Sequence, residues 1–174
     1  MKKTQEAAFM GAASYYELSP EYSLDQTDTD KALAKLQTFV NTYPDSEYFE
    51  EANLMAKELT TKQEKKAFEI ARQFNKIGEF DYTFLTPAVS AFENFVSDYP
   101  GSVYREAALF YKFEAATRMA LNSLQRLKPQ RIEEAMAAYA TLKKQFPETA
   151  YAKEAEKWLK KIDKESQNFT ELSK

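Results

Sequence analysis

A short segment occurs three times in this chain and constrains its fold more than any other feature. The copies read Tyr-Pro-Asp-Ser-Glu-Tyr at 43–48, Tyr-Pro-Gly-Ser-Val-Tyr at 99–104 and Phe-Pro-Glu-Thr-Ala-Tyr at 146–151. Apolar residues recur at fixed offsets around each proline: Ala32, Ala88 and Ala135; Leu36, Phe92 and Tyr139; Phe39, Phe95 and Leu142; Ala52, Ala108 and Ala155. Self-similarity at intervals of 56 and 47 residues is typical of helical repeats. We therefore expect an all-α superhelix of stacked helix pairs, an α-α solenoid.

Helical periodicity and helix-boundary signals predict where the helices lie. We expect helices at about 7–18, 30–42, 46–77, 86–98, 102–124, 129–145 and 149–165. A hydroxyl can accept a hydrogen bond from a free N–H group at a helix start, which suits Ser46, Ser102 and Thr149 as N-caps. Thr86, followed by a proline, suits another helix start. Gly78 is expected to end the long helix in the left-handed conformation.

Composition argues against several classes of function. Lys and Arg total 24 and Asp and Glu total 27, so the chain lacks the positive charge that nucleic-acid binding requires. It contains no cysteine and no histidine, which removes thiolate chemistry and the commonest general base. Neighbouring carboxylates such as Glu50 and Glu51 point in different directions on a helix. We expect a protein that is not an enzyme and that binds no metal, cofactor or nucleic acid.

The helices are expected to form one domain over 1–174, with about three repeats and a polar tail at 166–174. The first helix carries Phe9, Met10, Tyr15 and Tyr16, many apolar groups for a helix with nothing upstream to cover it. We therefore expect the chain to be the C-terminal part of a longer array. No apolar run approaches the roughly 20 residues that span a bilayer.

The alanine and ring positions before each proline resemble the second helix of a tetratricopeptide repeat. Two features depart from that pattern: the interval between copies is longer, and Phe39, Phe95 and Leu142 occupy a position that is usually small. These departures, the Tyr-Pro-x-Ser-x-Tyr run, the long connecting helix and the Ser-Leu-Asp-Gln-Thr loop at 23–27 resemble the BamD family of outer-membrane assembly lipoproteins. The resemblance covers about residues 5–165, as that family's C-terminal repeats.

The resemblance implies a location, a partner and a function. Members of that family lie on the periplasmic face of the outer membrane, held by a lipid anchor, and help a barrel insertase fold other barrels. Their C-terminal repeats dock on the periplasmic domains of the insertase. This chain, which lacks the lipidated cysteine, would then be a soluble, non-enzymatic docking scaffold. The alternatives are a general tetratricopeptide adaptor of the periplasm or cytoplasm, and an accessory domain of an enzyme.

A stripe of cations is the first candidate binding site. Lys65, Arg72 and Lys76 are spaced by seven and four residues, which places them on one face of a helix, flanked by Phe68. If this face lines the concave groove of the repeats, it could hold an acidic or carboxylate-ended segment of a partner. The alternative is a solvated face on which Glu69 pairs with its cationic neighbours.

Large apolar residues in the connections are the second candidate site. Tyr22, Leu24, Phe80, Tyr82 and Phe84 lie where a helical repeat does not require large side chains. They either form a patch that contacts a protein partner or fold onto their own helices.

Overall fold

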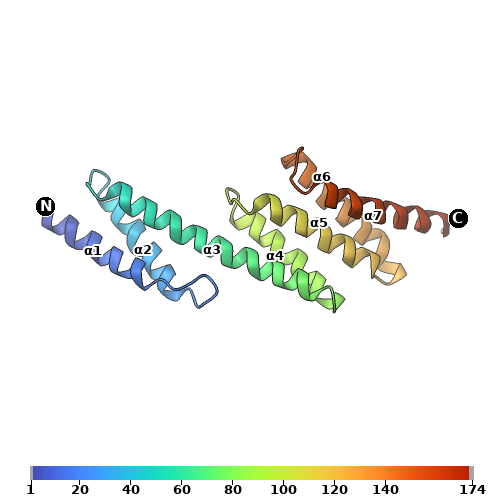
Figure 1. Cartoon of the computed structure of the whole chain (residues 1–174), viewed down its shortest axis with the longest axis horizontal. Helices are drawn as coiled ribbons and strands as arrows, with labels where there is room; N and C mark the ends of the chain where they lie inside the picture. Colours follow the sequence, from blue (N-terminus) through green and yellow to red (C-terminus); the bar gives the residue numbers. More distant parts are fainter. Residues whose placement is uncertain (1, 173–174) are drawn as a thin grey trace. The chain divides into compact units, whose positions relative to one another are not determined.

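The computed structural model describes residues 2–172, with side chains through residue 168. The described chain consists of helices and connections and contains no strand (Figure 1). The α-helices are α1 (Lys2–Leu18), α2 (Thr27–Thr42), α3 (Phe49–Ile77), α4 (Leu85–Asp98), α5 (Arg105–Leu121), α6 (Lys128–Gln145) and α7 (Ala152–Leu172). Two short 3-10 helices, η1 (Tyr82–Phe84) and η2 (Gln125–Leu127), precede α4 and α6. The expected all-α repeat fold is confirmed. No helix within residues 2–172 combines the length and apolarity needed to cross a bilayer.

The helices belong to two compact units, Met1–Lys66 and Ala67–Lys174, whose boundary falls within α3. In the first unit α1 packs against α2 (Figure 1). In the second unit α5 packs against both α4 and α6, and α7 packs against α5 and α6. Each unit therefore buries the apolar faces of its helices against one another, as the repeat pattern predicts.

The residues that recur around each proline form the core. The alanines at the repeated positions have almost no exposed surface: Ala32, Ala52, Ala88, Ala108 and Ala135 at 0%, and Ala155 at 1%. Small side chains at these positions let neighbouring helices approach closely. The larger residue five before each proline is also buried, with Phe39 at 3%, Phe95 at 2% and Leu142 at 0% exposure.

The repeated segment also leads into a helix in each copy. Ser46 Oγ accepts a hydrogen bond from the Tyr48 backbone N–H at 3.3 Å. Ser102 and Thr149 accept equivalent bonds from the residues two positions later, each at 3.2 Å. The predicted N-caps are nevertheless wrong, because the helices begin three residues later, at Phe49, Arg105 and Ala152, and the hydroxyls accept from the residue just before each helix. The N-cap residue of α5 is Tyr104, which makes no side-chain capping bond.

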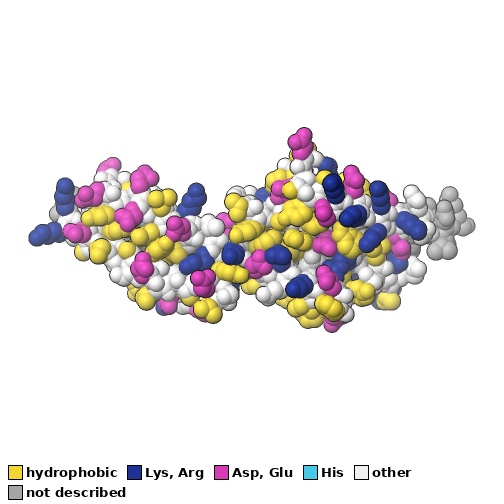
Figure 2. All heavy atoms as spheres, in the orientation of Figure 1, with side chains coloured by type: hydrophobic (Ala, Val, Ile, Leu, Met, Phe, Trp, Pro, Cys, Tyr) yellow, Lys and Arg dark blue, Asp and Glu magenta, His cyan; other side chains and the backbone are white. Residues whose placement is uncertain are grey.

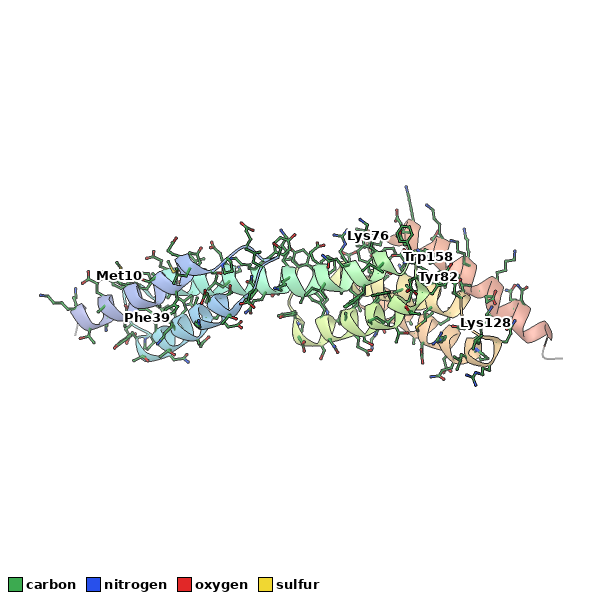
Figure 3. The ribbon with its side chains drawn as sticks, turned by 90° about the horizontal axis from the view of Figure 1, so that it is seen from below. Met10, Phe39, Lys76, Tyr82, Lys128 and Trp158 are labelled. Carbon is green, nitrogen blue, oxygen red and sulfur yellow. The ribbon has the colours of Figure 1, made fainter. Side chains whose placement is uncertain are left out.

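The last tyrosine of each copy stacks on a phenylalanine of an earlier helix: α1 for the first copy, α3 for the second and α5 for the third. The stacked pairs, by ring-centroid distance, are Phe9 with Tyr48 at 4.6 Å, Phe68 with Tyr104 at 4.9 Å and Phe110 with Tyr151 at 4.5 Å. One such ring pair therefore belongs to each repeat. In the first unit this stack buries Phe9, which is 4% exposed, so the expectation that Phe9 would be uncovered is wrong. Met10 of the same helix is 60% exposed (Figure 3).

Gly78 does not adopt the left-handed conformation that we expected at the end of α3. No described glycine has a positive φ. Gly78 is instead buried against Leu85, and an added Cβ would lie 2.5 Å from Leu85 Cδ2. The glycine leaves room for the buried Leu85 side chain at the start of α4, and its backbone does not turn to positive φ.

Several helix boundaries also differ from those expected. Helices α3, α5 and α7 begin three residues later, and α1 and α2 begin earlier, at Lys2 and Thr27. Helix α4 begins at Leu85, so Thr86 lies inside it, and Asp81 caps the preceding 3-10 turn by accepting from the Thr83 N–H at 2.9 Å. The hydrogen bonds from Thr83 lower the pKa of the Asp81 carboxyl below its ordinary value. Helix α5 ends at Leu121 rather than near residue 124, and α7 continues to Leu172 rather than ending near residue 165.

Candidate functional site

A groove of about 490 Å³ opens on the second unit, between the C-terminal part of α3 and α5. Its lining carries both signs of charge and one ring: Glu69, Arg72, Gln73, Asn75, Lys76, Glu79, Tyr111 and Glu114. On the face of this unit seen in Figure 2, side chains of both charges lie among apolar side chains. Lys76 and Trp158 of α7 lie on the same side of the unit in Figure 3. Such a surface suits a protein segment that also carries mixed charges.

Arg72 and Lys76, two of the three predicted stripe cations, line this groove. Arg72 is paired with Glu69 at 3.0 Å, which confirms that part of the stripe pairs locally. The Arg72 guanidinium also lies 5.9 Å from the ring centroid of Phe68 and 5.7 Å from that of Tyr111. Both side chains of the ion pair keep exposed surface, so the pair contributes little to stability and stays accessible to a partner.

Phe68 was expected to flank the binding stripe, but the structure buries it instead. Its side chain is 4% exposed and lies in the core of the second unit. Its ring contacts four others, with centroid distances of 6.2 Å to Phe92, 5.7 Å to Phe95, 4.9 Å to Tyr104 and 6.3 Å to Tyr111. Because Phe68 occupies the ring position that recurs in every repeat, packing accounts for it fully.

Lys65, the third stripe cation, belongs to the first unit and interacts with the loop between α1 and α2. Its Nζ lies 4.1 Å from the ring centroid of Tyr22, close enough for a cation–π contact. Two neighbouring lysines of α3 bind the same loop. Lys62 Nζ donates to Ser19 Oγ at 2.8 Å, and Lys66 Nζ donates to the Leu24 carbonyl. The loop therefore folds back onto α3, and Lys65 holds it there.

The remaining loop residues divide between exposure and packing. Phe80 is 87% exposed, Tyr82 54% and Leu24 58%. Phe84, at the end of η1, instead stacks on Phe74 of α3 at a centroid distance of 6.3 Å, so it packs onto the helix that precedes the connection. Phe80 and Tyr82 are close in sequence, on the connection between α3 and α4, and remain the stronger candidates for contact with a partner.

Hydrogen-bonded polar side chains beneath the groove were not predicted from the sequence. Arg118 Nη1 donates to the side-chain Oδ1 of Asn75 at 3.0 Å, and Asn75 Nδ2 donates to Glu114 Oε2 at 3.2 Å. Asn75 is 6% and Arg118 8% exposed. One signal was present in the sequence: a glutamate and an arginine four residues apart flank the run of small residues at 115–117 of α5. Within the described residues, no group of acidic side chains is arranged to hold a metal ion.

Comparison with known proteins identifies the family. A family model described as YfiO, outer membrane lipoprotein, matches residues 1–130. The chain belongs to the YfiO family of outer membrane lipoproteins. The BamD-type resemblance of the repeats is thereby confirmed.

A curated relative of this YfiO-family chain is the outer membrane protein assembly factor BamD of Caulobacter vibrioides. The two proteins are 28% identical over 118 residues, which make up 68% of this chain. The matched region spans only 37% of the length of that relative.

Proposed function

We propose that this chain is a non-enzymatic scaffold for the assembly of outer-membrane β-barrel proteins, acting at the periplasmic face of the outer membrane. The observation that carries the proposal is the match to the outer membrane lipoprotein family over residues 1–130. The name of the Caulobacter vibrioides relative, an outer membrane protein assembly factor, supports it. Helical repeats present wide, continuous surfaces, and binding is their usual role.

The partner that we propose is the set of periplasmic domains of the barrel insertase, docked on the second unit. Two features of this unit support the choice. The groove offers the accessible cations Arg72 and Lys76, and the connection between α3 and α4 offers Phe80 and Tyr82. Aromatic and arginine side chains dominate the binding energy of protein interfaces. Exposed rings that make no core contact are therefore the first residues to test.

Calorimetric titration of the purified chain with the purified periplasmic domains tests this docking. We expect specific binding, weakened about tenfold or more when Phe80→Ala and Tyr82→Ala are combined, because a buried aromatic anchor contributes about 2 kcal/mol or more. Val103→Ala is the matched control, because Val103 is 80% exposed on the connection between α4 and α5. Its affinity should equal that of the unaltered chain.

Two further results decide the proposal. Charge reversal at Arg72 and Lys76 should weaken the binding and reduce its dependence on salt, because screened ion pairs are removed. Failure of the unaltered chain to bind the periplasmic domains would contradict the proposal and favour a general adaptor.

A further inference from the structure

The groove of the second unit is built on a chain of three polar side chains that begins in the interior. Arg118 donates from one nitrogen, Nη1, to both the Asn75 backbone carbonyl at 3.1 Å and Asn75 Oδ1 at 3.0 Å. The Asn75 Oδ1 is thereby occupied, so the amide nitrogen Nδ2 must face the other way, where it donates to Glu114 Oε2 at 3.2 Å. Asn75 and Arg118 are both more than nine-tenths buried. The position of the Glu114 carboxylate is therefore fixed from beneath.

Glu114 presents this fixed carboxylate to the groove. Burial raises the pKa of the carboxyl above its ordinary value, although the hydrogen bond from Asn75 and the charge of Arg118 act in the opposite direction. The charge of Glu79, on the connection after α3, raises the pKa further, and that of Lys161, on α7, lowers it. The surrounding groups thus leave the anionic form of Glu114 less well solvated than it would be in water.

No donor other than Asn75 serves this carboxylate within the described part of the chain. A carboxylate can accept several hydrogen bonds, so the partly buried Glu114 carboxylate keeps acceptor capacity on the side that lines the groove. An external donor that bears a positive charge would complete the hydrogen bonding and offset the loss of solvation.

The groove already holds one guanidinium in the manner that such a donor would require. The guanidinium of Arg72 lies over the Tyr111 ring and pairs with the Glu69 carboxylate. Arg72 and Glu69 neutralise each other as an ion pair. The other charged side chains of the lining are two acidic groups, Glu79 and Glu114, and one basic group, Lys76, so they carry an excess of negative charge. An arginine fits this combination better than a lysine, because its planar fork both stacks on rings and binds carboxylates through two donors.

We propose that the groove receives an arginine side chain of a protein partner, whose guanidinium donates to Glu114. The arginine would come from an extended or loop segment, because the groove is open along the helices rather than closed around a small molecule. This proposal rests on the proposed function, in which a protein docks on the second unit, and it specifies the chemistry of that partner.

The probe for this site is a capped tripeptide, Ac-Gly-Arg-Gly-NH2, compared with Ac-Gly-Glu-Gly-NH2. Both are titrated into isotope-labelled chain and followed by NMR of the Asn75 side-chain amide and the Glu114 carboxyl carbon. We expect the arginine peptide alone to shift both signals and to lower the pKa of Glu114. Glu114→Gln should weaken its binding about tenfold or more, because a charge-assisted hydrogen bond is lost. Equal shifts with the two peptides would overturn the proposal.

Glu133→Gln is the matched control for the loss of one negative charge, because Glu133 is exposed on α6, which does not line the groove. It should bind the arginine peptide as the unaltered chain does. An equal loss of binding in Glu114→Gln and Glu133→Gln would show that only net charge matters, and would also overturn the proposal.

The same variants separate this proposal from the proposed function. If the arginine peptide binds as expected while the insertase domains fail to bind, the arginine site stands and the insertase is the wrong partner. If the domains bind Glu114→Gln as tightly as the unaltered chain and the peptide does not bind, the docking function stands and the arginine site is wrong.

Discussion

Replacing Phe68 with alanine should lower the free energy of unfolding far more than the same change at Phe80. Phe68 lies in the second half of α3, and Phe80 lies just after its end. Phe68 is 4% exposed and contacts four rings, so its truncation leaves a cavity in the core of the second unit. Truncation of a buried phenylalanine lowers the free energy of unfolding by about 3–5 kcal/mol. Phe80 is 87% exposed, and its truncation should change that free energy by less than about 0.5 kcal/mol.

Urea denaturation followed by circular dichroism at 222 nm measures both changes. For a chain of this size, the loss at Phe68 corresponds to a fall in Tm of about 6–20 °C. Phe68→Leu provides a milder variant that keeps the protein folded if the alanine variant does not fold. Equal midpoints for Phe68→Ala and Phe80→Ala would refute the assignment of Phe68 to the core and would restore it as a candidate for partner contact.

Three further predictions concern other residues of the second unit. Ala88 has no exposed surface, so Ala88→Leu should overpack the contact between helices and lower the free energy of unfolding by about 1–3 kcal/mol, whereas Ala140→Leu on the exposed face of α6 should leave the urea midpoint nearly unchanged. Thr117 Oγ1 is buried without a hydrogen-bond partner, so Thr117→Val should raise the free energy of unfolding by about 1 kcal/mol; a lower midpoint would mean that the hydroxyl is satisfied. Burial raises the pKa of Glu114 in the folded state, so the fold binds more protons than the unfolded chain and loses stability as pH rises above about 4.5. The urea midpoint of Glu114→Gln, measured from pH 4 to 7, should therefore rise relative to that of the unaltered chain as pH increases. A difference between the two midpoints that does not change with pH would contradict the raised pKa.

The repeat positions could be predicted from the sequence because packing imposes the same demand in every copy. Alanine at the sites of close approach, such as Ala32 and Ala135, is a demand of helix geometry. The hydroxyls of the repeated segment were expected to cap helices, but they bond within the turn before each helix, because the helices begin three residues later than expected. These features depend on residues that are close in sequence or that recur at a fixed interval.

The candidate site was harder to predict because it depends on contacts between distant segments. Phe68 looked like part of a charged stripe, since its stacking partner Tyr104 lies in another copy of the repeat. Gly78 looked like a left-handed helix end, because nothing in the sequence shows that Leu85 packs against it. The hydrogen bonds from Arg118 to Asn75 and from Asn75 to Glu114 join α5 to α3 across about forty residues, a separation that helical periodicity does not reveal.

Depletion of the full-length protein in its own cells tests the central claim most directly. The amount of folded β-barrel protein in the outer membrane can be measured by its altered migration when gel samples are heated. If the protein is a scaffold for barrel assembly, depletion should lower the folded fraction of several barrel proteins together, and expression of the unaltered protein should restore it. Unchanged levels of folded barrels after depletion would contradict the claim.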